Sequence, residues 1–119
     1  MINVIVVPEI EDFIRDVTYE EVIWINKALG VPKLEEKNAK YIAPFWITDK
    51  FRGVNRIYHI NDAYVTKNGT FEFVLGNSFI LTNVWDSMGN PRKFEYHKLS
   101  SFGMLEIKEG LLIPFTMDQ

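Results

Sequence analysis

The stretch AYVTKNGTFEFVL, residues 63–75, constrains the fold of this chain more than any other segment. Asn68 and Gly69 lie between two runs rich in β-branched and aromatic residues, which is the strongest short-range signal for a two-residue hairpin turn. The sequence therefore predicts two antiparallel strands here. Their register would put four residues on one face as two cross-strand pairs, Thr66 with Phe71 and Tyr64 with Phe73.

Further turn signals divide the rest of residues 41–115 into short strands. We expect a second turn at Gly76–Asn77, followed by a strand near residues 78–82, and a loop over WDSMGNPR. KFEYHKL alternates like a strand, and MLEIK and LLIPF flank Glu109–Gly110 as a last hairpin. A meander of this many strands with one apolar face tends to curl into a barrel, because closure removes exposed edges.

Residues 1–40 have a different pattern. INVIVV predicts a strand that ends at Pro8. An apolar stripe at helical spacing follows: Ile10, Phe13, Ile14 and Val17. Thr18 and Glu21 form a capping box, which predicts a second helix from Tyr19 to a stop at Gly30. The expected fold is thus a single α+β domain, residues 1–119, with an N-terminal helical pair packed on a mostly antiparallel, barrel-like sheet.

Composition sets the limits on function. The chain of 119 residues has no cysteine, which excludes a disulfide scaffold and a thiol nucleophile and is typical of a cytoplasmic protein. No apolar run approaches the length of a membrane span. The net charge is −3, although residues 41–100 carry seven basic and five acidic side chains. This small excess permits contact with phosphates and does not demand it.

The segment FWITDKFRGVNRIYHIND, residues 45–62, contains the first group of candidate binding residues: Trp46, Arg52, Arg56, Tyr58 and His59. On a strand, Arg56 and Tyr58 share one face and His59 takes the other. Parity carries Arg56 and Tyr58 onto the face of Tyr64 and Phe73, unless Asn61–Asp62 forms a bulge. With Trp46, they would hold a base by stacking and a phosphate by charge. In the structural alternative, the strand is part of the core, and the aliphatic part of the Arg56 side chain packs on Tyr58 where the strand meets the surface.

A second group lies in and directly after the expected loop WDSMGNPR. Trp85 would be a stacking platform, and Arg92 and Lys93 a basic rim beside it. The alternative is a solvated strand face, with Trp85 holding the loop against the core.

Catalytic patterns are weaker. His59 and His97 are the only histidines and lack metal-site spacing, so neither a metal nor a cofactor is predicted. Glu106 and Lys108 form an E-x-K strand, with Asp86 upstream, as in carboxylate-plus-lysine nucleases. The same residues also fit a plain strand that ends in a turn.

The order of YIAPFWITDKFRGVNRIYHINDAYVTKNGTFEFVLG and RKFEYHKLSSFG resembles small barrels of the PUA-like group, including EVE-type and restriction-enzyme-associated domains, over residues 41–103. That resemblance implies recognition of RNA or a modified DNA base at the barrel mouth, where Trp46, Arg56, Tyr58 and Trp85 match by character. We expect a non-catalytic binding module for nucleic acid or a nucleotide. The alternatives are a protein-interaction or inhibitory module that uses the acidic helices, and a small nuclease or hydrolase.

Overall fold

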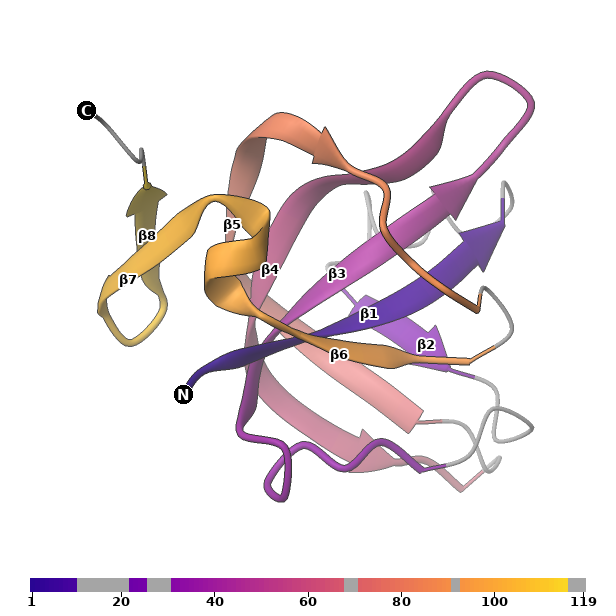
Figure 1. Ribbon diagram of the computed structural model, residues 1–119. Helices are drawn as coiled ribbons and strands as arrows, with labels where there is room; N and C mark the ends of the chain where they lie inside the picture. The colour runs from indigo at the N-terminus through magenta and orange to yellow at the C-terminus, as the bar shows by residue number, and fades with distance from the viewer. Residues whose placement is uncertain (11–21, 26–30, 68–70, 91–92, 116–119) are drawn as a thin grey trace.

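The computed structural model describes residues 1–10, 22–25, 31–67, 71–90 and 93–115 (Figure 1). Strands dominate these residues, and the only helical element among them is the short 3-10 helix η2. The elements are β1 (Asn3–Ile10), β2 (Val22–Ile25), β3 (Ala39–Ile47), β4 (Arg52–Val65), β5 (Phe71–Trp85), β6 (Glu95–Lys98), η2 (Leu99–Phe102), β7 (Met104–Lys108) and β8 (Leu111–Pro114).

Six strands form one sheet in the order β2-β5-β4-β3-β1-β6, and β7 and β8 pair only with each other. The predicted mostly antiparallel arrangement is confirmed, with β1 and β3 as the one parallel pair among the described strands. Strands β2 and β6 are the edges, so the described residues form an open, strongly twisted sheet instead of a closed barrel (Figure 1). The hairpin β7–β8 stands apart at the left of that view.

The predicted N-terminal helical pair is wrong, and the fold is mainly β. Strand β2 occupies Val22–Ile25, in the middle of the expected second helix, and pairs with β5. Its sequence, VIWI, consists of β-branched and aromatic residues, and a short apolar run of this kind fits a helix as well as a strand. The other parts of both expected helices, residues 11–21 and 26–30, lie outside the described residues. Among the described residues, no helix has the length and apolar character needed to cross a membrane.

Strand β1 also continues past Pro8, where the sequence predicted its end. The reason lies in its neighbours. Strand β6 pairs only with Asn3–Val6, so beyond Val6 the described residues give β1 a partner on one side only. A proline, which cannot donate a hydrogen bond, is tolerated in such a position.

The hairpin predicted around Asn68–Gly69 is confirmed as the antiparallel pair of β4 and β5, but its register differs by one residue. Val65, one residue earlier than expected, pairs with Phe71. Phe73 is therefore fully buried, whereas Tyr64 is exposed. A one-residue shift moves every side chain to the other face, so burial of Phe73 selects this register. The turn residues themselves lie outside the described residues.

Other expectations for this region fare differently. The predicted turn at Gly76–Asn77 is wrong, because β5 runs through it without interruption. The loop after Trp85 and the last hairpin around Glu109–Gly110 are confirmed.

The sheet buries both of its faces. Along β1, Val4 and Val6 point into one core cluster and Ile5 and Val7 into the other. Residues of η2 and the β7–β8 hairpin complete the first cluster, and Tyr96 of β6 packs against the second. Burial on both faces explains why β1 and β3 are nearly continuous apolar runs.

Candidate functional site

Two bulges in the β4–β5 ladder shape a cleft. One residue of β4, His59, faces two residues of β5, Gly76 and Asn77. A second shift follows on β4, where Asn61 is the extra residue, so the predicted bulge at Asn61–Asp62 is confirmed. Bulges re-aim side chains and are frequent beside binding sites.

The cleft has a volume of about 780 Å³, which lies in the range of small-molecule sites. A Cβ atom at Gly76 would lie 2.6 Å from Oδ1 of Asn61, so a larger residue there would displace the Asn61 side chain. Residues of β4, β5 and the β7–β8 turn line the cleft: Arg56, Tyr58, His59, Asn61, Leu75, Gly76, Asn77, Ser78, Glu109 and Gly110.

The β7–β8 turn forms one wall and is fixed to the sheet through Gly110. The backbone N–H of Gly110 donates to the hydroxyl of Tyr41 at 3.0 Å, and its carbonyl accepts from Nδ2 of Asn77 at 3.0 Å. Gly110 has a φ of 81°, and an added Cβ would lie 3.1 Å from Nδ1 of His59. Only glycine combines this backbone conformation with such a close approach.

Tyr41 connects the turn to the sheet from beneath. Its hydroxyl, in a fully buried side chain, also donates to Oε2 of Glu106 at 2.6 Å. Burial raises the pKa of Tyr41, and the hydrogen bond to Glu106 raises it further, so the phenol stays protonated. The ring of His59 lies 5.2 Å from the Tyr41 ring, between this hydrogen-bonded hub and the cleft.

Several polar groups of the cleft have no hydrogen-bond partner among the described residues. This holds for the side chains of Tyr58, His59, Asn61 and Glu109, whereas Nη1 of Arg56 donates to Oγ of Ser78 at 2.9 Å. Burial raises the pKa of Tyr58, and the nearby Arg56 partly offsets that effect. Tyr58 and His59 are half-buried, whereas Asn61 and Glu109 are exposed and accessible to water or to a ligand. A few polar groups of this kind in one cleft are typical of a ligand site.

The structure brings together three of the predicted site residues, Arg56, Tyr58 and His59, in this cleft. Trp46 is not one of the lining residues. It pairs with Gly53, whereas Tyr58 pairs with Ile42, which puts Trp46 about 13 Å further along the sheet. Its side chain is only 8% exposed and belongs to the core.

The other predicted residues lie elsewhere. Arg52 pairs with Asp86 at 3.3 Å and covers the Phe45 ring, 5.0 Å from its centroid. Trp85 is a core residue, in edge contact with Phe45. The side chain of Lys93 is exposed, and Arg92 lies outside the described residues.

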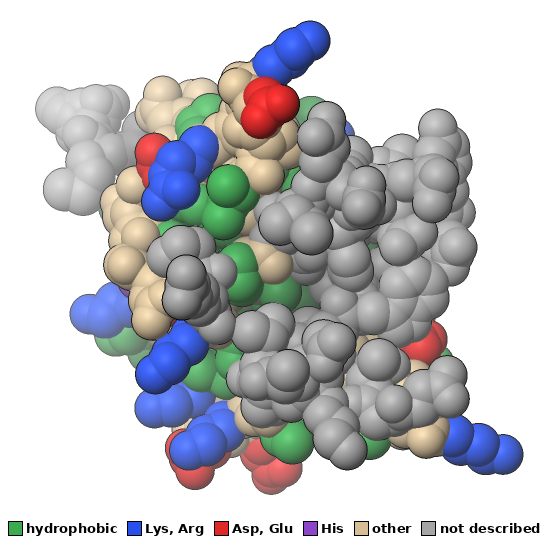
Figure 2. Space-filling view, turned by 90° about the vertical axis from the view of Figure 1, so that its right-hand side faces the viewer, with side chains coloured by type: hydrophobic (Ala, Val, Ile, Leu, Met, Phe, Trp, Pro, Cys, Tyr) green, Lys and Arg blue, Asp and Glu red, His purple; other side chains and the backbone are tan. Residues whose placement is uncertain are grey.

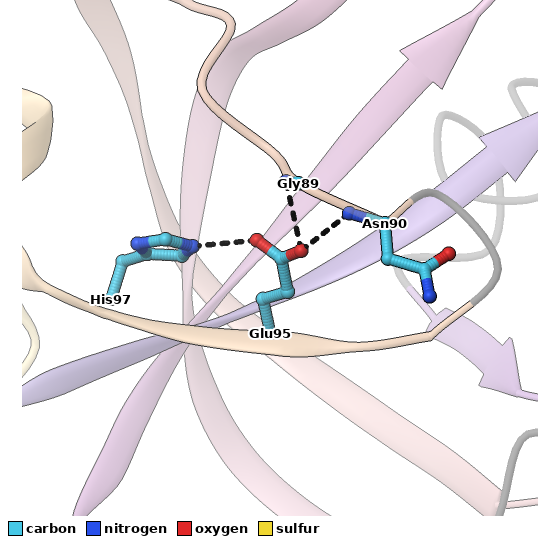
Figure 3. Close-up of polar contacts among 4 residues, drawn as sticks. All are labelled: Gly89, Asn90, Glu95 and His97. Carbon is cyan, nitrogen blue, oxygen red and sulfur yellow. Dashed lines mark hydrogen bonds and ion pairs between the residues drawn. The ribbon is translucent and has the colours of Figure 1, made fainter.

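The carboxylate of Glu95 binds the backbone of the loop between β5 and β6 (Figure 3). Its Oε2 accepts from the backbone N–H groups of Gly89 at 2.9 Å and Asn90 at 2.7 Å, and its Oε1 contacts Nε2 of His97 at 2.8 Å. Partial burial alone would raise the pKa of Glu95, but the hydrogen bonds from His97, Asn90 and Gly89 outweigh it and lower the pKa. This arrangement explains how the loop after Trp85 is anchored, and it does not adjoin the cleft.

The nuclease pattern is not assembled in the described residues. Asp86 is paired with Arg52, and Glu106 accepts a hydrogen bond from the Tyr41 hydroxyl, so the two carboxylates serve separate contacts. No group of three His, Asp or Glu side chains that could hold a metal ion occurs in the part of the chain that the structure describes.

Asn77, Ser78, Glu109 and Gly110 are cleft residues that the sequence did not single out. Both pairs were predicted as turns: the turn at Glu109–Gly110 is confirmed, whereas Gly76–Asn77 lies within β5. Nothing in the sequence indicated that the two would meet. A scan against protein-family models, a search of curated proteins and a search of solved structures each gave no match to this chain.

Proposed function

We propose that this chain is a non-catalytic binding module that holds one nucleotide unit of an RNA or DNA strand in the cleft. The observation that supports this proposal best is the convergence of Arg56, Tyr58 and His59 on one cleft with unpaired polar groups. A cytoplasmic location and a relationship to PUA-like domains are parts of the same proposal.

The three side chains match the parts of a nucleotide. Arg56 uses one guanidinium nitrogen on Ser78, and its remaining N–H donors can reach a phosphate, for which the planar guanidinium is well suited. The rings of Tyr58 and His59 offer faces on which a base can stack. Asn61 adds an amide that can both donate and accept.

The charge of the site predicts weak dependence on salt. Arg56 is the one Lys or Arg among the lining residues. Figure 2 shows the side of the molecule away from the β7–β8 hairpin, where several Lys and Arg side chains gather at the lower left and others stand apart. Each phosphate contact to a single strand contributes a slope of roughly −0.7 to the logarithm of affinity against the logarithm of salt concentration. We therefore expect a slope near that of one contact.

The test is a titration of short single-stranded RNA and DNA oligonucleotides against matched variants. Arg56→Ala should weaken binding and flatten the salt slope. Arg52→Ala removes the same charge from the same strand but outside the cleft, so it should leave affinity unchanged. Tyr58→Leu keeps an apolar side chain and removes the stacking ring. It should weaken binding, because stacking of a base on an aromatic ring contributes roughly 1–3 kcal/mol to the binding free energy.

Two results would contradict the proposal: no oligonucleotide binding by the folded wild-type protein, or equal losses from Arg52→Ala and Arg56→Ala. In the first case a protein-interaction module becomes the better hypothesis. That alternative rested on two acidic helices, and the strand at Val22–Ile25 removes the second of them.

A further inference from the structure

Glu109 is an exposed residue whose position is nevertheless fixed. It precedes Gly110, both of whose backbone polar groups are bonded to the sheet, through Tyr41 and Asn77. Gly110 also packs closely against the ring of His59. The Glu109 backbone is thereby held beside the cleft before any ligand arrives, which lowers the entropic cost of binding.

The carboxylate of Glu109 is exposed and favours ligand groups that donate hydrogen bonds. It lines the cleft and has no hydrogen bond or ion pair with a described residue. An ionised carboxylate is an acceptor with two oxygens and no donor, so its best partner is a pair of adjacent N–H groups. No other lining side chain carries a negative charge.

Among the common bases, only guanine presents two adjacent donors on its Watson–Crick edge, N1–H and the exocyclic amino group. Adenine and cytosine present one amino group beside a ring acceptor, and uracil presents one N–H between two carbonyl oxygens. A carboxylate repels those acceptors. Resting on the proposed nucleotide-binding function, we infer that the cleft selects guanine, with Glu109 as the residue that determines this preference.

The remaining polar groups of the cleft agree with this assignment. Guanine also has acceptors, O6 and N7, and the side-chain amide of Asn61 is an unpaired donor in the same cleft. The phosphate goes to Arg56, which keeps the negative phosphate and Glu109 at different parts of the ligand. Arg56 would thus bind the phosphate of the nucleotide and Glu109 the edge of its base.

The experiment measures affinity for short uridine oligonucleotides that differ only in one central base: guanine, inosine, adenine or cytosine. Wild-type protein should bind the guanine strand on the order of tenfold more tightly than the adenine and cytosine strands. Inosine, which lacks the exocyclic amino group, should fall between. Glu109→Gln replaces one carboxylate oxygen by an N–H donor and should remove the preference. Glu35→Gln, a charge change in the exposed connector before β3, should retain it.

The outcomes separate the two claims. Equal binding of all four strands by the wild-type protein would overturn guanine selection and leave nucleotide binding intact. A guanine preference that persists in Glu109→Gln would overturn the role of Glu109. If no strand binds, both the proposed function and the inference fail.

Discussion

Replacing Tyr41 by phenylalanine tests whether the β7–β8 turn is held to the sheet by one buried hydroxyl. The substitution keeps the ring and deletes two hydrogen bonds, the one from Gly110 N–H at 3.0 Å and the one to Glu106 at 2.6 Å. Gly110 is buried, so its N–H loses a partner that water cannot easily replace. A lost hydrogen bond to a charged group costs about 1.5–3 kcal/mol and an orphaned buried donor about 1–3 kcal/mol. Because Glu106 is only partly buried and can regain water, we expect a total loss near 2–4 kcal/mol.

The assay is thermal and urea unfolding, in which this loss corresponds to a fall in Tm of roughly 8–16 °C for a domain of this size. Tyr64→Phe is the matched control. The Tyr64 hydroxyl also donates to a glutamate, Glu72, at 2.6 Å, but its side chain is 44% exposed whereas that of Tyr41 is fully buried. The control should therefore change stability by less than about 0.5 kcal/mol. Equal losses of stability from the two substitutions would refute the argument that burial makes the hydrogen bonds of the Tyr41 hydroxyl more stabilising.

Three further predictions follow from particular contacts. In urea unfolding, Gly103→Ala should lower the free energy of unfolding by about 1 kcal/mol, and Gly110→Ala should lower it further. Both glycines have positive φ, but only at Gly110 would the new Cβ crowd a neighbour, His59. Glu95 has a lowered pKa in the folded protein, so its stabilisation is complete above its ordinary value of 4.5 and is lost as pH falls through the folded pKa. Glu95→Gln should accordingly have a lower Tm than the wild type at neutral pH, and its Tm should fall less steeply as the pH is lowered. Parallel curves of Tm against pH for the two proteins would contradict this. Trp46→Ala should cost about 3–5 kcal/mol in the same unfolding assay because it leaves a cavity in the core, and a cost below about 1 kcal/mol would show that the indole is not core.

The sequence predicted the antiparallel pairs because their signals are local. Glu109–Gly110 between MLEIK and LLIPF needs only neighbouring residues to specify a hairpin, and the structure has one there. The register around Asn68–Gly69 was missed by one residue because it depends on which side chain the core accepts. That core includes Phe73, whose surroundings come from other strands.

The helical prediction failed for a related reason. Val22 and Ile25 are spaced three apart, which fits an amphipathic helix, and the same VIWI run fits a strand equally well. Pairing with β5, nearly fifty residues later in the chain, decides between the two, and local propensity cannot show it. The predicted helix was thus wrong because a short apolar run can form a strand when a distant strand, here β5, pairs with it.

The cleft could not be predicted for the same physical reason, although its residues were partly identified. Arg56, Tyr58 and His59 lie within four positions of one another, and the alternation of a strand would send His59 to the opposite face from the other two. Both sets nevertheless line one cleft, beside the bulge opposite His59 and the extra residue Asn61. The far wall comes from Gly110, 69 residues away from the Tyr41 that holds it. Because strands and a doubly bonded turn carry the polar groups, ligand binding should require little rearrangement of the backbone. Substitutions of Arg56 and Glu109 should alter affinity with small effects on the fold.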